Sequence, residues 1–226
     1  MKKFVVIGLG NFGLSLSAQL TKLGHEVIGV DSSMSKVEQN KDIITSTICM
    51  DVCDIHSLKM LPITDADAVF VTIGEDFGSS VMVTALLKQL KANNIFSRAV
   101  NELHRTVLTA IGVKNILNPE EDSALRIATS IQYTGVVDSF KIDSVHSVVE
   151  MAVSELYWGR SIKEANLHER FGLQILGVKR QVKSFSILGK SELRHEIINS
   201  DQPDFKLLEG DIFVIYGTVT ALSKME

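Results

Sequence analysis

The sequence predicts an α/β protein in which a doubly wound parallel sheet is followed by a small α+β domain. Three observations support this fold class. The chain opens on a strand-like run that leads through a glycine-rich turn into a helical pattern. Strand and helix patterns then alternate as far as Pro119, as βαβ units require. After Val136 alternating strand-like runs replace that rhythm, so we predict two domains, residues 1–134 and 135–226.

The glycine-rich turn has the spacing G-x-G-x-x-G, at Gly8, Gly10 and Gly13. In such a unit the first glycine permits the turn, the second lets a pyrophosphate approach the backbone, and the third lets the helix pack close to the strand. Glycines alone are a weak signal, because they occur in many turns. A second strand, however, ends about 20 residues later at Asp31, placed to accept hydrogen bonds from ribose hydroxyls. The context therefore predicts a nucleotide-binding site.

The remaining elements of the first domain follow in order along the chain. The expected strands are 4–8, 26–31, 46–51, 68–73, 95–100 and 115–117, and the expected helices between them are 11–23, 35–41, 55–61, 79–92 and 102–111. A further helix begins at Pro119, with acidic residues in its first turn, and ends near Tyr133. Ligands of such sheets bind at the carboxyl ends of the strands.

Three further strand ends carry residues suited to a ligand. Asp51 has two possible roles: it faces an adenine or its ribose, or it is only a solvated residue of a turn. Asp54 is placed to cap the next helix. The run Thr72-Ile73-Gly74-Glu75 either lies beside the ligand or forms a plain loop. Arg98 either reaches the phosphates or forms a salt bridge at the end of its strand. Spacing alone does not separate these alternatives.

The second domain is expected to contain short strands and one helical segment. The expected strands are 137–142, 147–153, 173–179, 184–188 and 211–216, with a helix at 161–170. The stretch 189–205 is polar and contains Pro203, so we expect an exposed loop there.

Composition narrows the class of protein. The formal net charge is −4 and 22% of the residues are charged, which is typical of a globular chain and gives no basic excess for nucleic acid. No apolar run approaches the roughly 20 residues that span a bilayer, so we expect a cytoplasmic protein. Cys49 and Cys53 lack a second pair, and we expect buried free thiols rather than a zinc site or a disulfide.

Signals for catalysis are missing from the sequence. Its histidines are scattered with no paired carboxylate pattern, and neither a nucleophile motif nor a Walker lysine is present. The sequence therefore favours a nucleotide sensor that is not an enzyme. A small NAD-dependent oxidoreductase is the alternative, and a ligand-sensing scaffold with another membrane partner is a third. Asp31 argues against a 2′-phosphate and hence against NADP.

A series of short motifs, taken in order, resembles RCK proteins of the TrkA family, the cytosolic regulatory subunits of Ktr and Trk potassium transporters. The motifs are G-L-G-N-F-G at 8–13, Asp31, M-D-V-C-D at 50–54, V-T-I-G at 71–74, S-R-A at 97–99, I-L-N-P-E at 116–120 and L-L-E-G-D-I-F-V-I-Y-G at 207–217. The resemblance covers nearly the whole chain and looks closest to the KtrA-like branch.

This resemblance implies a non-catalytic gating subunit. It implies a Rossmann-like RCK N-terminal domain that binds ATP or ADP, or NAD(H) as in the Trk branch, and a TrkA_C-like domain for ligand binding or dimerisation. Homodimers are expected to assemble into a homo-octameric ring. That ring is expected to lie at the inner face of the cell membrane, beneath a membrane-embedded potassium transporter subunit of the KtrB or TrkH kind.

The resemblance also implies which residues contact the nucleotide. They are Gly8, Gly10, Asn11, Phe12, Gly13, Asp31, Ser32, Lys36, Asp51, Val52, Thr72, Ile73, Gly74, Glu75, Arg98 and Glu120. Asn11 stands where relatives often have a basic residue that holds the terminal phosphate, which leaves NAD(H) a candidate. Glu120 matches a family glutamate that takes part in binding Mg²⁺ or another cation.

In Ktr relatives the small domain also binds cyclic di-AMP, through an apolar pair and an arginine. The matching positions in this chain are Ile162, Lys163 and His168, with the histidine in place of the arginine. A plain dimerisation module is the alternative for this domain.

Overall fold

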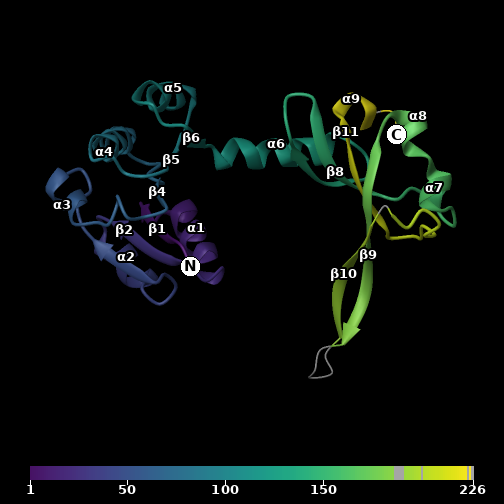
Figure 1. Ribbon diagram of the computed structural model, residues 1–226, viewed down its shortest axis with the longest axis horizontal. Helices are drawn as coiled ribbons and strands as arrows, with labels where there is room; N and C mark the ends of the chain where they lie inside the picture. The colour runs from purple at the N-terminus through teal and green to yellow at the C-terminus, as the bar shows by residue number, and fades with distance from the viewer. Residues whose placement is uncertain (186–190, 200, 223, 225–226) are drawn as a thin grey trace. The chain divides into compact units, whose positions relative to one another are not determined.

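The structure is a computed structural model that describes residues 1–185, 191–199, 201–222 and 224 (Figure 1). The chain forms two compact units, residues 1–121 and 122–226. The domain boundary that we place after residue 134 stays a prediction. In the part of the chain that the structure describes, no helix has the length and apolar character needed to cross a bilayer.

Unit 1 is built around a six-stranded parallel sheet with the strand order β3-β2-β1-β4-β5-β6. The strands are β1 (Lys3–Ile7), β2 (Glu26–Asp31), β3 (Ser46–Cys49), β4 (Ala68–Val71), β5 (Ile95–Arg98) and β6 (Asn115–Leu117), and the helices are α1 (Asn11–Lys22), α2 (Met34–Asn40), α3 (Ile55–Lys59), α4 (Phe77–Gln89) and α5 (Glu102–Ile111). The order reverses between β1 and β4, as in doubly wound folds.

The central strand β1 explains why the sheet is covered on both faces. Successive side chains of a strand point to opposite faces. Val5 and Ile7 pack into one buried cluster with Leu58 and Leu87, whereas Val6 packs into another on the opposite face. A continuous apolar run is what a parallel strand buried on both sides requires. The predicted fold class is confirmed.

Several predicted strands extend a little beyond the structural ones. β3 ends at Cys49, β4 at Val71 and β5 at Arg98, because the chain leaves the sheet at each of these points. Single backbone bonds continue past two of these ends, with Met50 N donating to Asp31 O over 3.1 Å and Thr72 N donating to Ile7 O over 2.8 Å.

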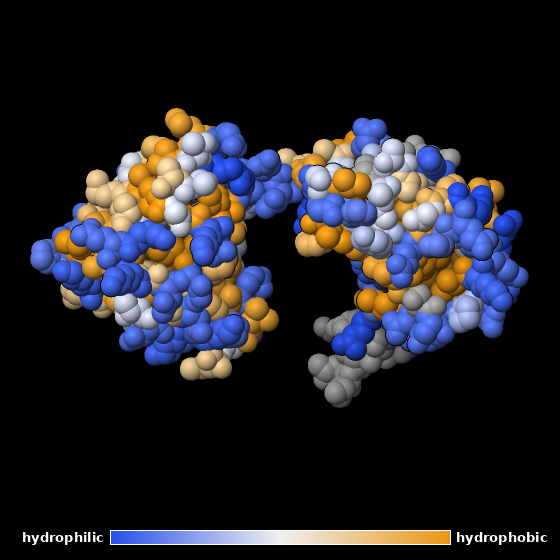
Figure 2. Space-filling model, turned by 45° about the horizontal axis from the view of Figure 1, so that its top comes forward, coloured by the Kyte–Doolittle hydropathy of each residue, from blue (hydrophilic) through white to orange (hydrophobic). Residues whose placement is uncertain are grey.

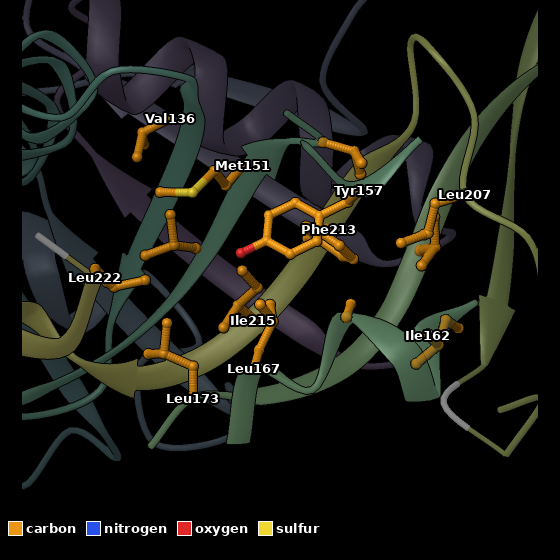
Figure 3. Packing of buried hydrophobic residues seen from close by; sticks show 14 of the residues in the cluster. Val136, Met151, Tyr157, Ile162, Leu167, Leu173, Leu207, Phe213, Ile215 and Leu222 are labelled. Carbon is orange, nitrogen blue, oxygen red and sulfur yellow. The ribbon is translucent and has the colours of Figure 1, made fainter. Parts of the chain in front are cut away.

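Unit 2 contains an antiparallel five-stranded sheet with the order β10-β9-β11-β8-β7. The division between the units falls within α6 (Pro119–Gln132). The other elements of unit 2 are β7 (Val136–Lys141), β8 (His146–Ala152), the 3₁₀ turn η1 (Glu155–Tyr157), α7 (Ile162–Ala165), α8 (Leu167–Phe171), β9 (Gln174–Phe185), β10 (Ser191–Asn199), β11 (Ile212–Thr218) and α9 (Val219–Leu222). Phe213 lies at the centre of its core, with Ile215 beside it and the Tyr157 ring edge-on at 5.9 Å (Figure 3).

Two expectations for this unit, those for residues 161–170 and 189–205, were wrong, and a third, for 184–188, agrees with the structure over the residues that it describes. The expected helix at 161–170 is two short helices, separated by Asn166 in a left-handed conformation with φ of 46°. The expected strand at 184–188 is the end of β9 as far as Phe185, with 186–188 outside the described residues. The expected loop at 189–205 contains β10, which pairs with β9 through the backbone and needs no apolar pattern. Of that stretch, residues 189, 190 and 200 also lie outside the described residues.

Apolar residues interrupt the charged surface of each unit (Figure 2). On α6 no residue is buried, although Leu125, Ile127 and Ile131 are apolar, and Ile131 is 80% exposed. Such side chains are suited to a partner surface. Cys49 and Cys53 are free thiols and half-buried, so the expectation of buried free thiols holds in part.

Candidate functional site

The candidate site lies at the carboxyl ends of β1 and β4, where the strand order reverses. Gly8 has φ of 101°, a conformation that side chains other than glycine rarely adopt. Its N–H donates to Val30 O over 2.7 Å, and a Cβ at this position would lie 3.1 Å from Ile73 N. The turn after β1 therefore depends on Gly8 for its shape.

Gly13 brings α1 against this turn. A Cβ on Gly13 would lie 1.9 Å from Gly8 O and 2.5 Å from Thr72 Oγ1. No side chain fits at that distance, so the contact requires glycine. Thr72 is buried, with 3% of its surface exposed. Its hydroxyl lies 2.6 Å from Gly8 O and 3.0 Å from Ile7 O and donates to these two carbonyls. Thr72 thus fixes the turn from the neighbouring strand.

Gly10 leaves the start of α1 open. It is the N-cap residue, and no side chain caps the helix and no acidic residue lies in its first turn. The space where a Gly10 side chain would lie has no atom within 4 Å. The first N–H groups of a helix have no partner within the helix and attract anions. The turn and α1 therefore offer a place for a phosphate.

Asp31 is buried beside the turn and holds it. Its Oδ2 accepts a hydrogen bond from Leu9 N over 2.8 Å, and its Oδ1 accepts one from Ser33 N over 2.9 Å. Lys36 Nζ lies 3.7 Å from Oδ2. Each carboxylate oxygen keeps a further lone pair for a ribose hydroxyl. Sequence reasoning missed the bond to Leu9, because a backbone donor leaves no signal in residue type.

Arg98 lies at the end of β5 and forms an ion pair with Glu120. Its guanidinium carbon is 6.0 Å from the centre of the Phe12 ring, and its Nε is buried without a hydrogen-bond partner among the described residues. A Cβ on Gly74 would lie 2.5 Å from Arg98 Nη1, so this glycine makes room for the guanidinium. The structure therefore brings Phe12, Gly74, Arg98 and Glu120 together.

Other predicted contacts lie around this centre in different ways. The side chains of Asn11, Ser32 and Glu75 are exposed, whereas Val52 is buried in the core cluster. Asp51 is exposed and its Oδ1 accepts from Cys53 N over 2.9 Å. Of these five side chains, only that of Val52 is buried.

The helix-capping role predicted for Asp54 is confirmed. Its carboxylate accepts from His56 N and Ser57 N at the start of α3. Hydrogen bonds from these two N–H groups hold the pKa of Asp54 below its ordinary value. This acid therefore has a structural role.

The predicted residues of the small domain do not share one surface. Ile162 is 8% exposed and its side chain lies in the core (Figure 3), whereas Lys163 and His168 are exposed. Within the described residues, no group of three or more His, Cys, Asp or Glu side chains is arranged to hold a metal. Glu120 as a cation ligand stays a prediction.

Comparisons with known proteins agree on one family. The model of the TrkA-N domain matches residues 4–119. Ktr system potassium uptake protein C of Bacillus subtilis strain 168 is 33% identical over 225 residues, covering 100% of this chain and 96% of that protein. Protein A of the same system and strain is 31% identical with the same coverage.

A solved structure supports the fold. The GsuK RCK domain matches with a TM-score of 0.66 at 16% identity, over 100% of this chain and 47% of that chain. This chain thus spans about half the length of that structure. With the TrkA-N match and the full-length alignments to two Ktr proteins, the chain belongs to the TrkA-N domain family, alongside the Ktr system potassium uptake proteins.

Proposed function

We propose that this chain is the nucleotide-binding regulatory subunit of a potassium uptake system and is not an enzyme. The observation that carries the proposal is the uncapped start of α1, held by Thr72 and Asp31, in a chain that aligns along its length with Ktr proteins. The glycine turn supplies the phosphate site, and the alignment supplies the biological setting.

The geometry suggests a binding mode. The nucleotide pyrophosphate lies over Gly10 and accepts from the first N–H groups of α1. The ribose hydroxyls donate to the free lone pairs of Asp31. Arg98, beside Phe12, donates to a phosphate oxygen. The remaining predicted contacts, Ser32 among them, stay predictions.

Our first candidates for the ligand are ATP and ADP, and NAD(H) is the alternative. Two observations favour the alternative: Asn11 is uncharged, and each cation next to the turn already faces an acid, Arg98 with Glu120 and Lys36 with Asp31. A triphosphate would have to compete for these cations or bring a metal ion. GsuK, which shares the fold, has been solved bound to NAD and bound to ADP.

Regulation requires assembly and a partner. We propose that the chain forms homodimers that assemble into a homo-octameric ring, peripheral to the inner face of the membrane, on a membrane-embedded potassium transporter subunit. The exposed apolar residues of α6 support an interface between copies. A ring with two shapes responds to a nucleotide only if the nucleotide binds the two shapes with different affinity. For a nearly complete switch, the two binding free energies must differ by about 5.5 kcal/mol.

The decisive experiment is calorimetric titration of the purified chain with ATP, ADP, NAD and NADH, with particle mass followed by light scattering. Gly10→Val should abolish nucleotide binding while the circular dichroism stays unchanged, because a side chain there enters open space that the phosphate needs. Gly24→Ala is the matched control: Gly24 lies beyond the other end of α1, with φ of 82° and open space around it. It should lose some stability and retain affinity.

Three outcomes would count against the proposal. Unchanged affinity in Gly10→Val would remove the site assignment. Turnover of NADH with carbonyl compounds would favour an oxidoreductase. Failure to co-purify with any transporter subunit in detergent would favour a scaffold with another partner. Cyclic di-AMP binding to the second unit stays a prediction, tested in the same titration.

A further inference from the structure

Strands β9 and β10 form a two-stranded arm in unit 2 (Figure 1). β11 pairs with β9 only between Gln174 and Lys179, so the rest of β9 pairs with β10 alone. β10 is the last strand of the sheet. Among the residues that the structure describes, no strand pairs with its outer edge.

This edge lacks two of the devices that protect strands against pairing. Exposed edges present unpaired backbone groups, and natural proteins blunt them with proline, bulges or charged side chains, of which β10 has only the charges. β10 contains no proline and pairs with β9 without a bulge over its whole length. Two of its side chains, Leu193 and Ile197, are apolar and are 61% and 64% exposed. A strand partner would cover both the backbone groups and these side chains.

The sequence of β10 is complementary to itself. It reads Leu193-Arg194-His195-Glu196-Ile197. If two copies pair antiparallel around His195, Arg194 of each lies opposite Glu196 of the other, and Leu193 lies opposite Ile197. Because side chains alternate along a strand, the charged pairs share one face and the apolar pairs the other. Opposite charges and apolar pairs across strands each stabilise a sheet by about 0.2–1 kcal/mol.

The neighbouring strand favours this arrangement. In β9, Arg180 lies directly across from Glu196, and its guanidinium is also bonded to Asp211 over 2.6 and 2.7 Å. Arg194 lies across from Val182 and forms no ion pair with the described residues. A second copy would supply Arg194 with a carboxylate and would place each Glu196 between two guanidinium groups.

Other registers are less favourable. Pairing centred on Arg194 places two guanidinium groups opposite each other, and pairing centred on Glu196 does the same with two carboxylates. Like charges directly opposite destabilise a sheet. Only the register centred on His195 matches both charges and apolar residues among these three.

We propose that β10 pairs antiparallel with β10 of a second copy of this chain around His195, joining two sheets across a two-fold axis. The same surface of both copies forms this interface, as two-fold symmetry requires. The proposal does not depend on the nucleotide site, which lies in unit 1. Strand pairing in the arm and nucleotide binding are therefore tested separately on the same protein.

Cysteine cross-linking tests the register directly. In a full chain whose native Cys49 and Cys53 are replaced by serine, His195→Cys should form a disulfide-linked dimer under mild oxidation, since directly opposite Cβ atoms lie about 4.5–5.5 Å apart. Arg160→Cys, exposed and outside the arm, is the matched control and should stay mostly monomeric on a non-reducing gel. Arg194→Cys should also stay at the control level. In this register position 194 faces position 196 of the second copy, so the two cysteines lie two positions apart along the strands.

Each other result of this experiment overturns the proposal. Cross-linking of His195→Cys at the control level excludes the pairing. Equal cross-linking of the cysteines at 195 and 194 indicates random collision. A disulfide to a different protein when the chain is expressed with its membrane partner means that the arm binds another occupant. Circular dichroism and nucleotide titration of the variants show whether unit 1 remains intact.

Charge reversal provides a second test that does not depend on disulfide geometry alone. Adding Arg194→Glu or Glu196→Arg to His195→Cys should lower the dimer yield at least tenfold, because like charges then face each other. Arg160→Glu, an exposed change outside the arm, should leave the yield unchanged. Mixing the two charge-reversed chains restores both opposite-charge pairs and should restore a mixed dimer. An unchanged yield in the single reversals, or no recovery on mixing, overturns the proposal.

Discussion

Replacing Asp31 by alanine should loosen the glycine turn even without a ligand. The change removes the acceptor of two backbone N–H groups, those of Leu9 and Ser33. A hydrogen bond to a charged group contributes about 1.5–3 kcal/mol. Water replaces the acceptor of the partly exposed Ser33 N–H, whereas the buried Leu9 N–H is left unpaired. We therefore expect a loss of about 2–4 kcal/mol.

Hydrogen exchange of the Leu9 amide measures this loss at the bond itself. Since about 1.4 kcal/mol corresponds to tenfold, exchange should become faster by about thirtyfold or more. Asp31→Asn retains one carboxamide oxygen as an acceptor and should show a smaller effect. Lys36→Ala removes only the half-exposed cation at 3.7 Å and should leave the rate unchanged. If Leu9 exchange in Asp31→Ala stays within about threefold of the wild-type rate, the local stability has fallen by less than about 0.7 kcal/mol, and the reasoning is refuted.

Three further predictions concern packing and pH. Gly13→Ala should unfold or strongly destabilise unit 1 in thermal melts, because its Cβ would lie 1.9 Å from a carbonyl oxygen. Phe213→Ala should destabilise unit 2 by about 3–5 kcal/mol, as measured by urea unfolding followed through the fluorescence of Trp158, the single tryptophan. Burial lowers the pKa of His104, so the unfolded chain binds its proton more readily. Stability should therefore fall as the pH drops below about 6.5, and His104→Phe should reduce that slope in urea titrations at several pH values.

Much of unit 1 follows from sequence because its signals are local. β2, β6 and α5 have the predicted bounds, since each is an apolar pattern closed by residues with a clear role. Asn101 begins α5 by accepting from His104 N, and Gly112 ends it in a left-handed conformation. Signals of this kind are present in the residue types themselves.

The arm and the details of the site could not be predicted in the same way. β10 is polar because most of its side chains face solvent, and pairing through the backbone leaves little trace in residue type. Arg98 and Glu120 were both singled out, but their ion pair depends on the parallel pairing of β5 with β6, which brings residues 22 positions apart together. Sequence patterns indicate candidates, and the register of the sheet decides which of them meet.

The ion pair between Arg98 and Glu120 has a thermodynamic consequence. Glu120 lies in the first turn of α6, the helix within which the chain passes from unit 1 to unit 2. An anion that binds the Arg98 guanidinium displaces Glu120 from it. The measured binding free energy is therefore the gain from the new ion pair minus the loss of the one with Glu120. By reciprocity, any rearrangement of α6 that draws Glu120 away from Arg98 tightens anion binding by the same factor by which the anion favours that rearrangement.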